Sequence, residues 1–190
     1  MRTTTTMSAQ PSRSALLGGL AATVIGLLGA PGPAGAAVGT SAHPAAIRSC
    51  TPAQTRVWLG DGPGGGTAGT VYYPLEFSNV GRVRCTLDGY PGVSAYGSAG
   101  RRIGKPATRN PGSHATVTLA PGATAHAILG IRDWGAICSR QLRAQGLRVT
   151  APGERTATPI GFPFGACASA SVLVVEPVRP GVGIPGATTR

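Results

Sequence analysis

Apolar and polar residues alternate along short segments between Cys50 and Val178, which is the pattern of strands with one buried face. Residues 70–78 show this alternation most clearly. The side chains predicted on one side of that strand are Val71, Tyr73, Leu75 and Phe77. Those predicted on the other side are Tyr72, Pro74, Glu76 and Ser78. Because Pro74 cannot donate a hydrogen bond to a neighbouring strand, we predict an edge position or a bulge there.

Further strands are predicted in segments that glycine and proline separate. These segments span residues 55–59, 84–87, 93–96, 115–119, 124–131, 147–150 and 171–175. The turns at Pro91-Gly92 and Pro121-Gly122 place proline where φ is preset and glycine where φ must be positive. Only residues 139–145 suggest a helical turn. The 30 Gly and 17 Pro in 190 residues argue against a helix bundle. We therefore predict an all-β fold, an antiparallel Ig-like β-sandwich of about 7–8 short strands.

The first 36 residues have the order of a secretory signal peptide. Arg2 and Arg13 precede an apolar stretch over residues 15–30, and Ala34-Gly35-Ala36 supplies the small residues of a cleavage site. That stretch is shorter than the roughly 20 apolar residues of a membrane span, so we expect no span once the signal is removed. We predict a flexible leader over 37–49, the β-sandwich domain over 50–178 and a disordered tail over 179–190. The protein should be secreted and extracellular, with a possible association with the envelope.

Four cysteines lie in the part of the chain that would be exported: Cys50, Cys85, Cys138 and Cys167. An even number of cysteines in an exported protein indicates disulfides. A structural metal site usually brings two ligands close together in sequence, and this spacing is missing, so we predict no metal. Three pairings are possible. We favour Cys50–Cys85 with Cys138–Cys167, which would join the start of each half of the domain to its own following hairpin.

Three short motifs are more specific than the strand pattern. Residues 75–79 read LEFSN, residues 85–93 read CTLDGYPGV, and residues 117–122 read VTLAPG. Together with Cys138, residues 147–152 and Cys167, these motifs resemble the actinobacterial secreted family called domain of unknown function 4232. The resemblance covers about residues 50–178 and implies an exported or lipid-anchored β-sandwich with two disulfides. It implies no activity, because the family offers no active site to carry over.

The charge balance suggests an anionic partner. The net charge is +11. The first 36 residues contain two of the 17 basic residues and none of the six acidic ones, so their removal leaves +9. A basic exported protein is attracted to polyanions, such as anionic envelope polymers, and arginine can hold a phosphate through two hydrogen bonds. The candidate anion-binding residues are Arg82, Arg84, Arg101, Arg102, Lys105, Arg140, Arg143 and Arg148. The alternative is that GC-rich codons explain the arginines. No aromatic ladder accompanies them, so we predict no nucleic-acid binding.

Catalytic motifs are weak in this sequence. The histidines are His43, His114 and His126, and no G-x-S-x-G elbow supplies a nucleophile. The carboxylates are scattered rather than paired. Residues 60–65 formally match G-x-G-x-x-G, but a strand is predicted next instead of the helix that a phosphate loop needs, so we expect a hairpin loop. We predict a non-enzymatic protein without a cofactor.

The predicted partner is an anionic envelope polymer or another extracellular protein. The alternative function is secreted protease inhibition, and its candidate loop is residues 134–143, which include Cys138. The pair Asp133-Trp134 resembles the edge of a sugar site, but Trp134 packed against the core is the stronger interpretation.

Overall fold

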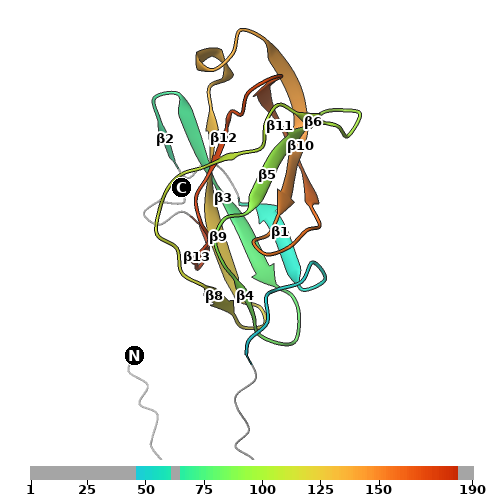
Figure 1. The fold of residues 1–190 in the computed structure, drawn as a ribbon, viewed down its shortest axis with the longest axis vertical. Coiled ribbons are helices and arrows are strands. Elements are labelled where there is room, and N and C mark those ends of the chain that lie inside the picture. The colour runs from blue at the N-terminus through green and yellow to red at the C-terminus, as the bar shows by residue number, and fades with distance from the viewer. Residues whose placement is uncertain (1–45, 61–64, 184–190) are drawn as a thin grey trace, which may run out of the picture. The chain divides into compact units, whose positions relative to one another are not determined.

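Alternating apolar residues build two facing β-sheets in the computed structural model, which describes residues 46–60 and 65–183 (Figure 1). The predicted signal peptide lies outside the described residues, as do residues 37–45 of the predicted leader. Within the described ranges, no helix has the length and apolar character needed to cross a membrane.

The larger sheet, called here the β3 sheet, has the order β1-β3-β9-β12-β7, while β2 also pairs with β3 and β13 with β9. Its strands are β1 (Thr55–Leu59), β2 (Gly65–Thr67), β3 (Thr70–Asn79), β7 (Thr108–Arg109), β9 (Thr124–Arg132), β12 (Leu173–Val175) and β13 (Arg179–Pro180). Its strand pairs are antiparallel except for β7 and β12, which run parallel.

The second sheet, called here the β10 sheet, has the order β11-β10-β5-β6. Its strands are β5 (Gly92–Tyr96), β6 (Arg102–Ile103), β10 (Gln141–Thr150) and β11 (Thr158–Cys167). A separate ladder joins β4 (Cys85–Leu87) to β8 (Val117–Leu119). The prediction of an all-β, sandwich-like fold is thereby confirmed, with more strands than the predicted 7–8 because several are only two or three residues long.

The core lies between the two sheets and follows the alternation in the sequence. Leu75 and Phe77 of β3 and Leu147 of β10 are fully buried. The ring of Tyr73 meets the ring of Phe162 from β11 edge-on, with centroids 5.0 Å apart. Side chains from both sheets therefore interdigitate in one core, as the apolar pattern predicted.

Pro74 is not at a sheet edge, because β3 lies between β1 and β9. The amide of Gly60 donates to the Pro74 carbonyl at 2.8 Å. In an antiparallel ladder the N–H and C=O of one residue face the same neighbour, so the missing Pro74 N–H faces Gly60, the residue after β1 ends. The sheet tolerates Pro74 because its neighbouring strand ends there.

The helical turn predicted over residues 139–145 is wrong. Strand β10 begins at Gln141 and pairs with both β5 and β11, and these ladders outweigh the local preference. A 3₁₀ turn occurs slightly earlier, over Trp134–Ala136, where the Asp133 carboxylate accepts a hydrogen bond from the Gly135 amide at 3.0 Å.

The ordered chain extends beyond the predicted domain at both ends. Arg179, predicted to begin a disordered tail, instead starts β13 and pairs with His126. Ser49, predicted to end a flexible leader, forms a bridge with Thr86, and the Thr86 amide donates to the Arg48 carbonyl at 3.0 Å. In both places the terminal residues of the domain add to an existing strand.

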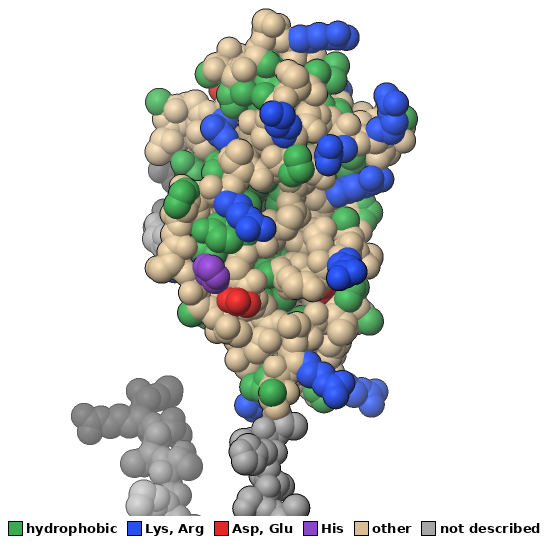
Figure 2. Space-filling model, viewed as in Figure 1, with side chains coloured by type: hydrophobic (Ala, Val, Ile, Leu, Met, Phe, Trp, Pro, Cys, Tyr) green, Lys and Arg blue, Asp and Glu red, His purple; other side chains and the backbone are tan. Residues whose placement is uncertain are grey.

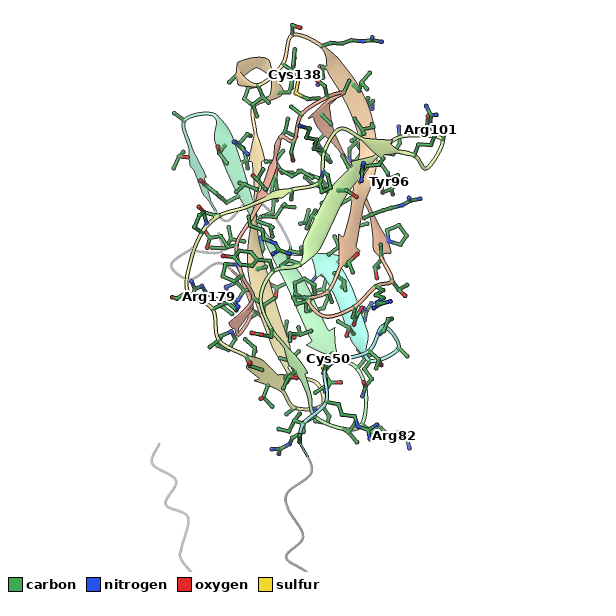
Figure 3. All side chains as sticks on the ribbon, viewed as in Figure 1. Cys50, Arg82, Tyr96, Arg101, Cys138 and Arg179 are labelled. Carbon is green, nitrogen blue, oxygen red and sulfur yellow. A yellow bond between two sulfur atoms is a disulfide. The ribbon has the colours of Figure 1, made fainter. Side chains whose placement is uncertain are left out.

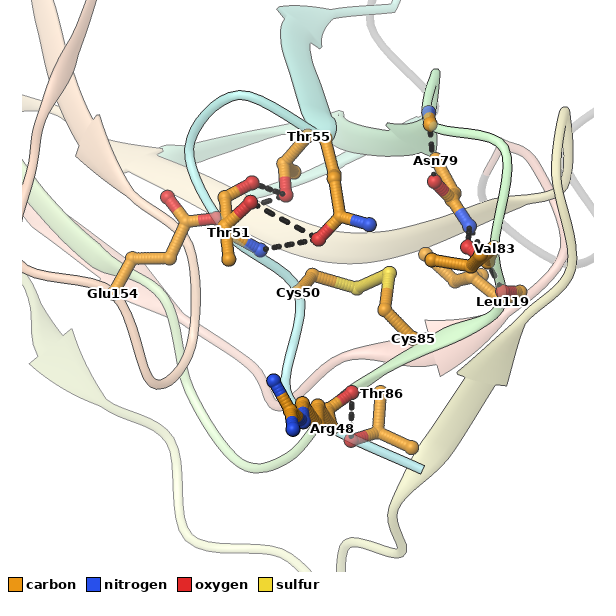
Figure 4. Close-up of a disulfide and its surroundings, with 12 residues drawn as sticks. Arg48, Cys50, Thr51, Thr55, Asn79, Val83, Cys85, Thr86, Leu119 and Glu154 are labelled. Carbon is orange, nitrogen blue, oxygen red and sulfur yellow. Dashed lines mark hydrogen bonds between the residues drawn. A yellow bond between two sulfur atoms is a disulfide. The ribbon is translucent and has the colours of Figure 1, made fainter. Parts of the chain in front are cut away.

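The favoured disulfide pairing is confirmed. Cys50 is bonded to Cys85, and Cys138 is bonded to Cys167 (Figure 4 shows the first pair). The first disulfide ties the start of the domain to β4, and the second ties the segment before β10 to the end of β11. Both are consistent with an oxidising compartment.

Candidate anion-binding site

The eight predicted anion-binding residues fall into two groups. Arg82 and Arg84 lie between β3 and β4, and Figure 3 shows Arg82 at the opposite end of the domain from Arg101. Arg101 and Arg102 lie at the β5–β6 hairpin, while Arg143 lies on β10. Figure 2 shows that Lys and Arg side chains are spread over the upper and middle parts of this face, with further ones at its lower end.

The upper group surrounds a hollow of about 310 Å³ on the β10 sheet. Arg101 and Arg102 line it from the hairpin, and Arg143 lines it from β10. The other five predicted residues lie outside this lining: Arg82, Arg84, Lys105, Arg140 and Arg148. The structure therefore brings three of the predicted residues together, although Arg101 and Arg102 are distant in sequence from Arg143.

Tyr96 and Arg148 lie on the same sheet outside the lining of this hollow. Tyr96 of β5 pairs with Arg102 on one side and with Gly146 on the other. The guanidinium of Arg148 lies 5.7 Å from the centre of the Tyr96 ring, within the range of a cation–π contact. Arg101, Arg102, Arg143 and Arg148, together with Tyr96, are called the arginine face below.

Two glycines allow this packing. Gly100 has a φ of +70° in the turn before Arg101, and a Cβ there would lie 3.5 Å from Nη2 of Arg148. A Cβ on Gly146 would lie 2.8 Å from the Tyr96 hydroxyl. The absence of a side chain lets the hairpin turn tightly at Gly100, and at Gly146 it leaves room for the Ile160 carbonyl oxygen and the Tyr96 hydroxyl.

The guanidinium groups of the arginine face are exposed and carry uncompensated charge. Among the described residues, the one acid–base contact within 4.0 Å joins His114 to Asp88 at 3.9 Å. Arg101, Arg102, Arg143 and Arg148 are all exposed. This arrangement can bind an anion without first breaking an internal ion pair.

Two buried ionisable residues on the β3 sheet were missed by the sequence analysis. Glu76 and His126 lie opposite each other on β3 and β9, only 4% and 2% exposed. The Gly183 amide donates to Oε1 of Glu76 at 2.6 Å, and Nδ1 of His126 lies 3.0 Å from the Gly181 carbonyl oxygen. Burial raises the pKa of Glu76, although the Gly183 N–H and His126 both act to lower it.

The sequence could not indicate this burial, because alternation assigns Glu76 to the outer face. Residues 181–183 cover that face, and they belong to the segment predicted as a tail. Burial also raises the pKa of Glu154, a shift opposed by the hydrogen bond from the Thr55 hydroxyl at 2.8 Å (Figure 4). Within the described ranges, His, Cys, Asp and Glu side chains form no group of three that could hold a metal ion.

The segment predicted as an inhibitor loop is divided between two kinds of structure. Its first residues form the 3₁₀ turn, and it enters the β10–β11 ladder at Gln141. Trp134 is partly buried against the core, in line with the preferred interpretation. The glycine-rich loop 60–65 leads into strand β2 rather than a helix, as the hairpin prediction required; residues 61–64 lie outside the described residues.

Comparison with curated proteins and with solved structures found no match. Comparison with protein families found one described as Domain of unknown function (DUF4232), which matches residues 50–179. The matched range begins at the first disulfide cysteine and ends in β13, so it covers both sheets and both disulfides. On this match the chain belongs to the family of Domain of unknown function (DUF4232) proteins.

Proposed function

We propose that this chain is an exported, non-enzymatic binding protein whose arginine face holds an anionic polymer of the cell envelope. The observation that carries the proposal is the convergence of Arg101, Arg102 and Arg143 on one hollow, with no carboxylate within 4.0 Å of any of them among the described residues. Guanidinium groups bind phosphate and carboxylate oxygens through paired hydrogen bonds. A repeating anionic polymer could occupy several of them at once.

Three features support export. Residues 1–36 have the order of a signal peptide, and the two disulfides suit an oxidising compartment. The motifs resemble an actinobacterial secreted family. An exported protein with this net charge meets anionic polymers at the envelope, and their charge raises its local concentration there.

The test is binding of the oxidised protein to labelled long-chain polyphosphate, measured by fluorescence anisotropy over a salt series. Purified cell envelope serves as the second probe. Binding should weaken steeply with salt, because each phosphate contact contributes roughly one to the slope of log affinity against log salt. The double variant Arg101→Gln/Arg143→Gln should bind more weakly and reduce that slope by roughly two.

The matched control is Arg82→Gln/Arg84→Gln, which removes the same charge from the opposite end of the domain. Its affinity should stay close to that of the natural protein. Equal losses in the two variants would show that net charge alone is responsible and would refute the arginine face as a site. No binding at low salt would refute polyanion binding altogether. Protease inhibition would then be tested next, by mixing the protein with proteases at equimolar ratio.

A further inference from the structure

Each of the two sheets ends in two outer strands, and three of these four strands are poorly suited to pair with another chain. β6 and β7 contain only two residues each. β11 contains Pro159 and Pro163, which lack the N–H that an added strand would bind. Short strands and prolines at a sheet edge limit association with other chains. β1, the outer strand of the β3 sheet, is five residues long and contains no proline. Among the described residues, it is therefore the sheet edge best suited to bind another strand.

The side of β1 that faces away from β3 presents the backbone groups of Val57 and Leu59. The ladder between β1 and β3 continues to Gly60, whose amide donates to the Pro74 carbonyl at 2.8 Å. Successive residues of an antiparallel strand direct their N–H and C=O groups to opposite sides. Residues 56 and 58 therefore also face β3, whereas Val57 and Leu59 face away. β11 of the facing sheet lies close to β1, but within the described ranges β1 pairs with β3 alone. Unpaired backbone groups at a sheet edge can bind an added strand.

The side chains of Arg56 and Trp58 point to the outer face of the β3 sheet, because the residues that alternate with them pack against the core. They border a hollow of about 630 Å³ on that face, which Val80 also lines. Arg56 is exposed, Trp58 is partly exposed and Val80 is 58% exposed. No carboxylate among the described residues lies within 4.0 Å of the Arg56 guanidinium. This edge therefore combines an aromatic ring, exposed apolar surface and an unpaired positive charge.

We infer that β1 is a dimerisation edge, which pairs in antiparallel fashion with β1 of a second copy of this chain. In a symmetric pairing centred on Val57, the two copies of Val57 exchange N–H···O=C bonds. Arg56 of each copy then lies directly opposite Trp58 of the other. Side chains that are directly opposite have Cβ atoms about 4.5–5.5 Å apart, so each guanidinium can lie over the facing indole in a cation–π contact. The symmetry of the dimer makes this contact twice.

The neighbouring registers of this pairing are less favourable. A pairing centred on Arg56 would place two guanidinium groups opposite each other, which is destabilising. A pairing centred on Trp58 would leave both guanidinium groups without a facing aromatic ring. In the register centred on Val57, each Trp58 ring also lies on the face that contains the hollow, where it can cover part of the exposed Val80 side chain. The sequence of β1 is thus complementary to itself, which favours a second copy of this chain over an unrelated peptide.

This inference is independent of the proposed function, because β1 and the arginine face lie on different sheets. The test is sedimentation velocity of the oxidised protein at concentrations from about 10 μM to about 1 mM. The edge is short, so we expect a weak dimer that forms within this range. Both copies are positively charged, and salt screens their repulsion. Dimerisation should therefore strengthen as salt is raised, whereas polyphosphate binding should weaken, and the two results can fail separately.

Two variants locate the interface. Trp58→Arg places an arginine opposite Arg56 of the other copy and should weaken the dimer about a hundredfold, roughly tenfold for each of the two lost contacts. The double variant Arg56→Trp/Trp58→Arg again places an arginine opposite a tryptophan and should return the affinity to within about threefold of the natural value. The matched control is Thr118→Arg, which adds the same charge at an exposed position of β8 and should change the affinity by less than about threefold.

Amide hydrogen exchange tests the role of β1 without any substitution. The N–H groups of Val57 and Leu59 should exchange more slowly at about 1 mM protein than at about 10 μM, because the dimer binds them. The absence of a dimer up to about 1 mM protein at any salt concentration would overturn the inference. So would a dimer that leaves the exchange of these two groups unchanged, or one that Trp58→Arg and Thr118→Arg weaken equally.

Discussion

Replacing Asn79 by alanine should destabilise the domain more than any exposed polar substitution, because its side chain organises the turn between β3 and β4. Asn79 is fully buried. Its Nδ2 donates to the carbonyls of Val83 at 2.8 Å and Leu119 at 3.0 Å, and its Oδ1 accepts from the Gly81 amide at 2.9 Å (Figure 4). One side chain thus joins the end of β3, the following turn and the end of β8.

The magnitude follows from these three hydrogen bonds. Each bond contributes about 1 kcal/mol net, and a buried partner left without its bond costs about 1–3 kcal/mol. Asn79→Ala removes all three bonds and leaves two carbonyls and one amide to find other partners. We therefore expect a loss of about 3–5 kcal/mol in the free energy of unfolding. A domain of this size has roughly 5–15 kcal/mol in total, so the variant should remain folded but marginal.

The assay is urea unfolding of the oxidised protein, followed by tryptophan fluorescence, with both disulfides intact. Asn110→Ala is the matched control, because Asn110 is exposed and makes one side-chain hydrogen bond, to Glu176. That control should lose no more than about 0.5 kcal/mol. A loss below about 1 kcal/mol for Asn79→Ala, or equal losses for both variants, would refute the reasoning.

Two further predictions concern a buried charge and a glycine. Burial raises the pKa of Glu76, so the folded protein holds this proton more tightly than the unfolded chain does. The contribution of Glu76 to the free energy of unfolding therefore falls as pH rises from the ordinary carboxyl range through the raised pKa. The variant Glu76→Gln should flatten that fall and increase stability near neutral pH. The measurement is urea unfolding across a pH series. At Gly104, with φ +65°, a Cβ would collide with the carbonyl oxygens of Cys167 and Ala170. Gly104→Ala should therefore abolish folding or cost more than about 3 kcal/mol in melting experiments, whereas Gly122→Ala, with φ +79° and open space around it, should cost about 1 kcal/mol.

The sequence predicted correctly a strand whose alternation and flanking turns lie within one short segment. Strand β1 occupies residues 55–59 as predicted, because its alternation and its flanking turns are contained in the segment itself. Strand β11 was missed, because Pro159, Gly161, Pro163 and Gly165 interrupt any strand pattern. It forms at an edge of the β10 sheet, where only one side of the strand needs hydrogen bonds. Its existence depends on β10 as a partner, which no local pattern contains.

The candidate anion-binding residues could be identified from the sequence, but their grouping could not. Arg82, Arg101 and Arg143 look equivalent in composition and charge. Arg101 and Arg143 share a hollow because the β5–β6 hairpin pairs with β10. Arg82 lies at the other end of the domain. The number of basic residues in the sequence therefore suggests a class of partner, whereas the order of the strands determines which of these residues lie together.

The outer face of the β3 sheet extends this argument to polar residues. Alternation assigns Tyr72, Glu76 and Arg132 to the side away from the core, and a sequence treats such positions as solvated. In the structure Glu76 is buried beneath residues 181–183, and Arg132 has a buried nitrogen without a partner among the described residues. Polar groups that are removed from water on the outside of a sheet are unfavourable unless something binds them. The Gly183 amide serves this purpose for Oε1 of Glu76, whereas Oε2 of Glu76 and Nε2 of His126, like Nε of Arg132, have no partner among the described residues.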